Sequence, residues 1–157
     1  MFTTYFRNDA VYRQKFRNGW YWTGDTARRD GDGYFWFMGR SDDVINTAGH
    51  LVSPFEVESA LLEVDEIAES GVIGVPDELL FEKIVAFVAL HAGREWSTEL
   101  ELKIRIHVAN RYSTIATPQE IIVADGIPKN KSGKIMRRVL KARYLGQDAG
   151  DTSTLDI

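Results

Sequence analysis

Two apolar segments constrain the fold of this 157-residue chain more than any other feature. Residues 71–75 and 84–90 are mostly β-branched or otherwise apolar, and turn-forming residues bound both runs. Short runs of this kind are typical of buried strands. We predict that they pair in a small sheet, and that residues 120–123 form a third strand.

The segment before these strands carries the signals of a helix start. Ser53 suits the N-cap, Pro54 the first helical position, and Glu56 the closing position of a capping box. Apolar residues then recur at helical intervals, so that one stripe faces the interior. The pattern predicts a helix from Pro54 to about Val64.

Two further helices are predicted downstream. Ser97 suits the N-cap of a helix whose apolar residues are spaced by four, and which ends near residues 110–113. A polar stretch at 129–133 then precedes a basic helix, which we expect from about Lys134 to Leu145.

Aromatic residues are concentrated at the start of the chain, where twelve of the 18 lie in the first 38 residues. Aromatic-rich runs between residues 19 and 39 flank an Asp-Gly-Asp-Gly sequence at 30–33, which predicts two strands joined by a tight turn. So many large rings are hard to bury within so short a segment. We interpret this segment as the edge of a larger body.

The order of these segments favours an α+β fold, in which a small sheet is flanked by helices as a two-layer sandwich and is preceded by the aromatic-rich hairpin. The polar stretch at 40–43 predicts a domain boundary near Asp42. We therefore divide the chain into residues 1–41, a domain of residues 42–146, and a flexible tail of residues 147–157.

Composition excludes several classes of function. The chain contains no cysteine, which rules out disulfides, thiolate metal sites and thiol catalysis. No apolar run approaches the roughly 20 residues that span a bilayer, and residues 1–7 lack the pattern of a signal peptide. We expect a cytoplasmic protein with neither a metal site nor a membrane partner.

Charge is distributed unevenly, although the formal net charge is only −4. Residues 53–82 contain nine acidic residues and no lysine or arginine, whereas residues 129–143 contain seven basic residues and no acid. Such a basic cluster attracts phosphate ligands or nucleic acid. The alternative is the solvated face of a helix.

The sharpest local candidate for a binding site is the segment that ends at Lys134. Gly133 lets the backbone turn, Ser132 offers a hydroxyl group, and Lys134 can reach from a loop toward an anion. The segment is not a Walker loop, because Pro128 and Ile135 stand where that motif requires Gly and Ser or Thr. The alternative is a basic cap of the next helix.

Shorter candidates lie nearer to the N-terminus. Thr-Gly-Asp at 23–25 suits the binding of vicinal hydroxyls, such as those of a ribose, but is also a common structural turn. The charged stretch 40–43 is alternatively an exposed turn whose ion pairs contribute little. His50 has no carboxylate or second histidine at ligand spacing, which favours packing over catalysis.

Taken together, these segments resemble one family in order and spacing. Residues 22–25, 39–50, 54–58 and 128–138 resemble motifs in the C-terminal third of the AMP-forming acyl-CoA synthetases, and residues 150–155 resemble the tail of the acetyl-CoA synthetases. The resemblance covers nearly the whole chain.

The resemblance implies a ligase reaction in two steps. ATP and a short carboxylic acid, acetate or similar, give an acyl-adenylate and pyrophosphate, and coenzyme A (CoA) then displaces AMP. ATP with Mg²⁺ and CoA would bind to the full-length enzyme, in which this chain is the lid on a large N-terminal adenylation domain. Residues 1–41 would be a remnant of that domain, and the chain alone would be inactive and would bind none of these ligands tightly. No nucleic acid is implied.

The same resemblance implies a role for each site residue. Asp25 would bind the ribose hydroxyls, Arg40 would contact the nucleotide, and Asp42 would be the hinge. Lys134 would be the lysine that acts in adenylation, and Gly49 would face the pantetheine arm of CoA.

Two positions depart from the acetyl-CoA synthetase pattern. Leu51 stands where an arginine directed at the phosphate is usual, and Ala109 stands where an arginine meets the nucleotide end of CoA. Arg111 is the candidate replacement for the second arginine. These departures favour a wider range of acids, and they leave open an adenylation domain that acts on a medium-chain or aromatic acid or loads a carrier protein.

Overall fold

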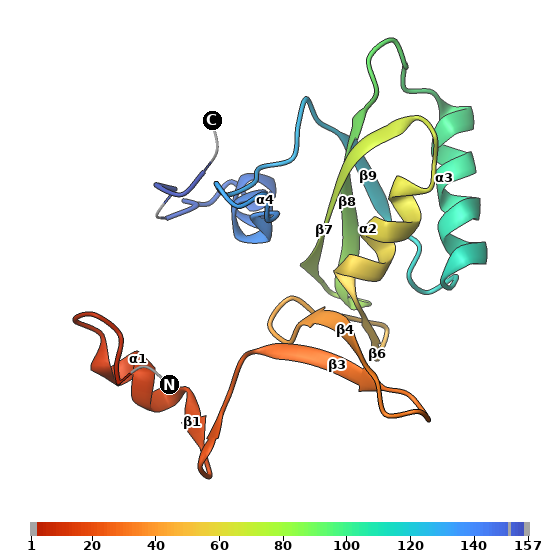
Figure 1. Cartoon of the computed structure of the whole chain (residues 1–157). Coiled ribbons are helices and arrows are strands. Elements are labelled where there is room, and N and C mark those ends of the chain that lie inside the picture. The colour runs from red at the N-terminus through yellow and green to blue at the C-terminus, as the bar shows by residue number, and fades with distance from the viewer. Residues whose placement is uncertain (1–2, 151, 156–157) are drawn as a thin grey trace. The chain divides into compact units, whose positions relative to one another are not determined.

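The computed structural model describes residues 3–150 and 152–155, and it divides into two compact units, Met1–Asp42 and Asp43–Ile157. Figure 1 shows the elements of each unit along the chain. The boundary between the units, between Asp42 and Asp43, lies within the polar stretch 40–43.

From residue 3 onward, where its description begins, the first unit consists of a short helix and two hairpins. Its elements are α1 (Asp9–Gln14), β1 (Phe16–Arg17), β2 (Trp20–Tyr21), β3 (Asp25–Arg29) and β4 (Phe35–Arg40). Strands β3 and β4 pair antiparallel, which confirms the predicted hairpin across residues 30–33. Its first strand is not aromatic as predicted, because Trp20 and Tyr21 lie in β2, which pairs with β1 instead. In the turn between them, the Asp30 carboxylate accepts hydrogen bonds from the Tyr34 amide at 2.9 Å and the Trp36 indole at 2.7 Å. The bond from Trp36 is the main reason that the pKa of Asp30 is lowered.

The aromatic rings of this unit lie largely at its surface. Trp20 is 80% exposed and Phe35 is 74% exposed. Among the described residues, those of the hydrophobic core begin only at Ile45, in the second unit. The hairpin therefore presents apolar surface that its own unit does not cover.

Over its described residues, 43–150 and 152–155, the second unit consists of a five-stranded sheet with three helices. Its elements are β5 (Ile45–Thr47), β6 (His50–Val52), α2 (Pro54–Leu62), β7 (Ile67–Asp77), β8 (Phe81–Leu90), α3 (Thr98–Arg111), β9 (Glu120–Val123) and α4 (Arg137–Leu145). Strands β7 and β8 pair antiparallel along their whole length, and β9 pairs with β8 in parallel, which confirms the predicted strand pair and the third strand. The remaining strands extend the sheet in the order β6-β5-β8-β7.

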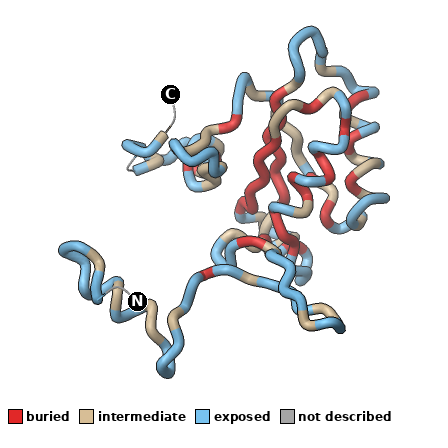
Figure 2. The backbone as a smooth tube through the Cα atoms, in the orientation of Figure 1, coloured by how far each residue is buried: buried red, intermediate tan, exposed pale blue. Residues whose placement is uncertain are grey.

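Alternating residues of β8 enter two separate cores, one on each face of the sheet. Ile84 and Val88 pack with residues of α2 and α3, whereas Val85 and Phe87 pack with Leu140 of α4. Because successive side chains of a strand point to opposite faces, a continuous apolar run is buried on both faces. Figure 2 shows buried residues concentrated along β7 and β8. The predicted α+β class is confirmed, and α4 adds a helix on the face opposite α2 and α3.

Helix starts follow the sequence only in part. The Ser97 hydroxyl accepts a hydrogen bond from the Leu100 amide at 3.1 Å, so this predicted cap is confirmed. Helix α2 begins at Pro54 as predicted, but the Ser53 side chain makes no capping bond, so the predicted capping box is wrong. Glu56, expected to close that box, lies beside Tyr112, whose pKa is raised to about 12 first by burial and then by the Glu56 carboxylate.

The start of the last helix also differs from the prediction. Helix α4 begins at Arg137 rather than near Lys134, because the preceding segment forms a hairpin in which Lys129 pairs with Ile135. Lys134 is therefore a loop residue. Its backbone therefore takes part in no helical hydrogen bonds of α4.

The turn between β5 and β6 allows a direct test of backbone strain. Ala48 and Gly49 both have positive φ, at 49° and 80°, as a two-residue hairpin of the I′ type requires. A Cβ at Gly49 would meet no neighbour within 4 Å, so Gly49→Ala changes only the backbone preference. We expect this variant to lower the free energy of unfolding by about 1–2 kcal/mol, as measured by urea denaturation.

Gly126→Ala is the matched control for this prediction, because its site is equally open but lacks a positive φ. It should leave stability unchanged or raise it slightly. An equal loss in both variants would show that strain at the β5–β6 turn is not the cause.

Candidate functional site

Lys134 lies on an exposed loop between β9 and α4. The loop closes where Lys129 pairs with Ile135, and Gly133 beside the lysine has a φ of 77°. Residues 131–134 are all exposed. Within the part of the chain that the structure describes, no carboxylate forms an ion pair with the Lys134 ammonium, whereas Lys129 at the loop's base is paired with Glu69 at 2.7 Å. The lysine is thus available to a ligand or a partner surface.

The side chain of Asn130 organises the inside of this loop. Its Oδ1 accepts hydrogen bonds from the backbone amides of Ser132 and Lys134 at 3.0 and 2.9 Å, and from the Ser132 hydroxyl at 2.8 Å. The Asn130 amide in turn donates to the Lys134 carbonyl oxygen at 2.9 Å. The hydroxyl of Ser132, expected from the sequence as a donor to an anion, therefore donates within the loop.

The end of the chain runs beside the outer edge of the same loop. Leu155 pairs with Asn130, and the Lys131 amide donates to the Thr154 carbonyl oxygen at 3.1 Å. The flexibility predicted for residues 147–157 remains a prediction. Their described part includes this backbone contact with the lysine loop.

Asp25, Arg40 and Asp42 come together in the first unit. The Arg40 guanidinium donates from Nε and Nη2 to the two carboxylate oxygens of Asp42 at 2.9 and 3.0 Å. Its Nη1 lies 3.6 Å from Asp25 Oδ1, across the β3–β4 pair. The bonds from Arg40 hold the pKa of Asp42 below its ordinary value. This charged group remains largely accessible to solvent, because both partners of Arg40 are about half exposed or more.

The turn at 23–25 has structural bonds of its own. The Asp25 amide donates to the Thr23 hydroxyl at 3.0 Å, and the Gly24 carbonyl oxygen accepts from the Ser41 amide at 2.8 Å. A Cβ at Gly24 would lie 3.0 Å from Arg40 Nη2, and its φ is 83°. Glycine at this position therefore lets the arginine lie across the turn. The turn therefore has structural hydrogen bonds, and Asp25 is exposed beside it.

The remaining candidate residues lie in the second unit but away from the Lys134 loop in sequence: Gly49, Leu51 and Arg111. Gly49 is at the exposed β5–β6 turn, and Leu51 on β6 is 74% exposed. Arg111 ends α3, where its Nε donates to both carboxylate oxygens of Glu63 at 2.9 and 3.0 Å. This pairing, more than the neighbouring His107, lowers the pKa of Glu63. Any ligand of Arg111 would compete with Glu63.

The acidic and basic segments of the sequence meet in the fold. Lys129 and Lys141 pair with Glu69 and Glu82, at 2.7 and 3.6 Å. Arg137 pairs with Glu58 within the same set of contacts. Because these acids belong to the acidic run 53–82, the basic segment is partly neutralised inside its own unit. Fewer unpaired positive charges are therefore left on this segment to bind a nucleic acid.

Arg137 is at the centre of a partly buried charge network that the sequence analysis missed. Its Nη1 and Nη2 donate to Asp43 Oδ2 at 3.0 Å and Glu58 Oε2 at 2.5 Å, and the Glu58 side chain is only 5% exposed. Glu58 Oε1 also accepts from the Val72 amide at 2.8 Å. Burial raises the pKa of Glu58, while Arg137 opposes that change. The available signal was an acid beside the apolar stripe of α2, which does not indicate its partner.

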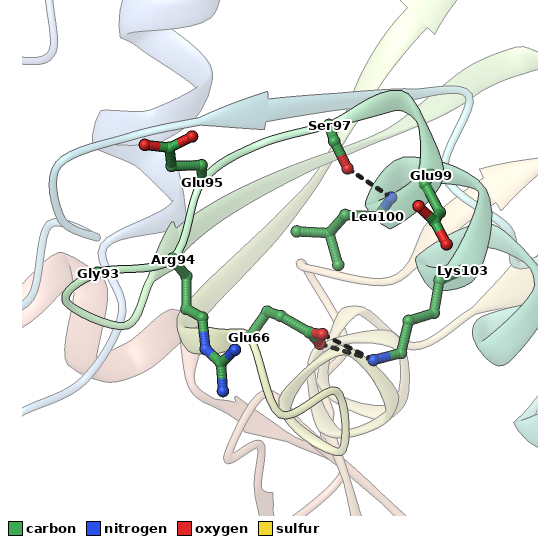
Figure 3. A pocket seen from close by; sticks show the side chains of 8 residues that line it. All are labelled: Glu66, Gly93, Arg94, Glu95, Ser97, Glu99, Leu100 and Lys103. Carbon is green, nitrogen blue, oxygen red and sulfur yellow. Dashed lines mark hydrogen bonds and ion pairs between the residues drawn. The ribbon is translucent and has the colours of Figure 1, made fainter.

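A separate pocket beside the start of α3 contains none of the candidate residues. Figure 3 shows its lining, in which Lys103 Nζ contacts both carboxylate oxygens of Glu66 at 2.9 and 2.8 Å. Ser97 in its wall caps the helix. Among residues 3–150 and 152–155, no group of three or more His, Asp or Glu side chains could hold a metal ion. No helix in that same part of the chain is long and apolar enough to cross a bilayer.

The fold and these residues define a small α+β domain with an accessible loop lysine, joined to an aromatic hairpin. The family model of the AMP-binding enzyme C-terminal domain matches residues 56–134, about half of the chain, from α2 to the lysine. The chain belongs to this family, which confirms the resemblance noted in the sequence.

Relatives within the family are acetyl-CoA synthetases. The acetyl-coenzyme A synthetase of Bacillus subtilis (strain 168) is 51% identical over 157 residues, which cover 99% of this chain and 27% of the relative. That of Methanothrix soehngenii is 50% identical over 139 residues, covering 88% of this chain and 21% of the relative. The chain therefore spans about a quarter of the length of these relatives.

Solved structures agree with this assignment. The anthranilate CoA ligase AuaEII in complex with anthranoyl-AMP is 36% identical, with a TM-score of 0.81 over 92% of this chain and 28% of the ligase. An ATP-bound MatB from Rhodopseudomonas palustris is 29% identical, with a TM-score of 0.78 over 90% of this chain and 28% of MatB.

Proposed function

We propose that this chain is the C-terminal lid of an AMP-forming acyl-CoA synthetase, and that Lys134 is the cation it supplies for adenylate formation. The observation that carries the proposal is the exposed loop lysine without an ionic partner among the described residues, in a chain of this family. The acid would be acetate or another short acid, as the names of the relatives suggest. An aromatic acid is the second candidate, because a structural neighbour is an anthranilate ligase.

The first half-reaction joins the acid to AMP. A carboxylate oxygen attacks the α-phosphorus of ATP, the bond from that phosphorus to the bridging oxygen breaks, and pyrophosphate leaves with the electron pair. Negative charge builds on the phosphate oxygens in the transition state. An ammonium group brought into a site from which water is excluded stabilises that charge far more than it would in bulk water.

The second half-reaction makes the thioester. The sulfur of CoA attacks the acyl carbon, the bond to the AMP oxygen breaks, and the thiol proton passes to a base or to water. The cation is not needed at this step, so the lid would turn away and present another face. Gly49 and Arg111 belong to the second unit, and we propose that they face CoA, Arg111 after exchanging Glu63 for a phosphate.

The turning point would lie at Asp42. Asp42 binds Arg40 of the first unit, whereas its neighbour Asp43 binds Arg137 of the second unit. Adjacent carboxylates thus anchor the chain to different units, and rotation can be absorbed by the few dihedral angles between them. We propose that Asp25 and Arg40 act at the nucleotide on the fixed side of this hinge.

The first unit would belong to the large N-terminal adenylation domain, which is the partner of the lid. Its exposed aromatic rings support this assignment, because they would be covered by the rest of that domain. ATP would enter with Mg²⁺ held largely by its phosphates. We place the enzyme in the cytoplasm, consistent with a sequence that contains no cysteine.

A chimera with the Bacillus subtilis relative tests the function. The 157-residue stretch aligned with this chain would be exchanged for the chain, leaving the N-terminal part of the relative unchanged. We expect acetate-dependent exchange of pyrophosphate into ATP, and formation of acetyl-CoA, at rates within about 100-fold of the parent enzyme. The same N-terminal part without any lid should be inactive.

The assay has a clear negative outcome. A chimera that is folded by circular dichroism but makes neither acetyl-adenylate nor acetyl-CoA would contradict the lid function. The choice of acid is tested separately, with the protein's own N-terminal part, by comparing acetate, octanoate and benzoate.

A further inference from the structure

Building on the proposed role of Lys134, we propose that Asn130 is a positioning residue, which holds the backbone of Lys134 so that its ammonium starts from a defined point. Asn130 contacts both backbone polar groups of the lysine. The Lys134 amide donates to Asn130 Oδ1, and the Asn130 amide donates to the Lys134 carbonyl oxygen, each at 2.9 Å. A single residue therefore holds the two peptide groups on either side of the Lys134 Cα atom.

The rest of the loop depends on the same side chain. Asn130 Oδ1 also accepts from the Ser132 amide at 3.0 Å, and the Asn130 carbonyl oxygen accepts from the Gly133 amide at 2.8 Å. Residues 131–134 are exposed, so no apolar packing holds them in place. The loop conformation is therefore set by hydrogen bonds that converge on Asn130.

Asn130 is itself held from the outside. Its backbone pairs with Leu155, and the next amide, that of Lys131, donates to Thr154 at 3.1 Å. On the inside, the Met136 amide donates to the Pro128 carbonyl oxygen at 2.8 Å, which closes the base of the loop. The backbone of Asn130 is thus fixed by its neighbours, and its side chain in turn holds the backbone of Lys134.

Precise placement matters because the lysine side chain is long. Lysine carries a charge on a flexible four-carbon stem, and a displacement of about 1 Å at a reacting centre can lower a rate by about 100-fold. Loss of the Asn130 oxygen would allow the start of that stem to move. The effect should be confined to the half-reaction in which the ammonium acts.

In the chimera, we expect Asn130→Ala to lower the rate of adenylate formation by about 10- to 100-fold. Formation of acetyl-CoA from supplied acetyl-adenylate should remain within about threefold of the unsubstituted chimera. Asn130→Asp keeps an acceptor oxygen at the same place and should restore most of the rate. Ser132→Ala is the matched control, because it removes one bond to the same oxygen and leaves both bonds to Lys134 in place.

A second measurement is independent of catalysis. In the 157-residue chain, NMR-detected exchange of the Lys134 amide hydrogen should become at least tenfold faster in Asn130→Ala and stay unchanged in Ser132→Ala. Unchanged exchange in β7 and β8 would show that the fold is intact.

The two measurements separate this proposal from the function on which it rests. If the unsubstituted chimera is inactive while the exchange result holds, the lid function fails and the loop geometry stands. If the chimera works, but Asn130→Ala keeps its adenylation rate or loses both half-reactions equally, Asn130 does not position Lys134. Failure of Asn130→Asp to restore the rate would overturn the proposal in the same way.

Discussion

Replacing Lys134 with alanine should lower the rate of acyl-adenylate formation in the chimera by about 1000-fold, because it removes the cation that faces the developing charge on the phosphate. Formation of acetyl-CoA from supplied acetyl-adenylate should be largely spared. Rapid-quench measurement of each half-reaction tests the split directly. The loss should be in the rate constant rather than in the affinity for acetate, since the ammonium acts in the transition state.

Lys131 offers a matched control for this experiment. It is an exposed lysine on the same loop, and its described contact, a bond from its amide to Thr154, uses the backbone alone. Lys131→Ala therefore removes a like charge three residues away without changing the loop. Equal losses in Lys131→Ala and Lys134→Ala, or equal losses of both half-reactions in Lys134→Ala, would refute the assigned role.

Replacing Arg137 with methionine should cause the largest loss of stability, about 3–5 kcal/mol of the free energy of unfolding. The reason is that Glu58 would remain as a buried carboxylate without a cation, and Asp43 would lose its partner. Arg137 Nε is already buried without a hydrogen-bond acceptor among the described residues. Urea denaturation of the 157-residue chain, followed by far-ultraviolet circular dichroism, measures the effect.

The loss in Arg137→Met should depend on pH. Burial raises the pKa of Glu58 in the folded protein, and removal of Arg137 takes away the main opposing influence. A carboxyl group whose pKa is higher in the folded state contributes stability below its ordinary value, and that contribution is lost as pH rises through the folded pKa. The difference between the wild type and Arg137→Met should therefore grow as pH rises from 4.5, the ordinary glutamate value.

Two further variants test whether Glu58 causes the loss of stability in Arg137→Met. Arg143→Met, at an exposed position of the same helix, should change stability by less than about 0.5 kcal/mol. Arg137→Met combined with Glu58→Gln should recover part of the loss and remove its pH dependence. A difference that is constant with pH would mean that Glu58 is not the source of the destabilisation.

Some helices and strands could be predicted from neighbouring residues alone, and others could not. The strands β7, β8 and β9 and the capped helix α3 were predictable, because apolar run length, turn residues and a capping serine act over a few neighbouring residues. The capping box predicted at Ser53 is wrong because the Ser53 side chain makes no capping bond, and Glu56 lies beside Tyr112, which is distant in sequence. Helix α4 begins later than predicted, at Arg137, because Ile135 pairs with Lys129 and so lies in the preceding loop.

The candidate site follows the same division. Lys134 was recognisable because its glycine and lysine neighbours form a motif with a fixed spacing. Asn130 was not, since its importance lies in which hydrogen bonds its oxygen accepts once the loop has closed. The contact of Thr154 with Lys131 was equally hidden, because pairing between distant backbone segments leaves no mark on side-chain type.

The amino-acid sequence by itself determined the family, the α+β class, the three strands β7, β8 and β9 of the sheet, and Lys134 as the candidate lysine. These features depend on composition, on periodicity and on motifs that lie within a few residues of one another. Only the tertiary structure decided that Arg137 joins Asp43 to Glu58, that the two charged runs partly neutralise one another, and that Asn130 holds the lysine. Burial and hydrogen bonding between distant residues depend on how the chain packs, and no local pattern encodes them.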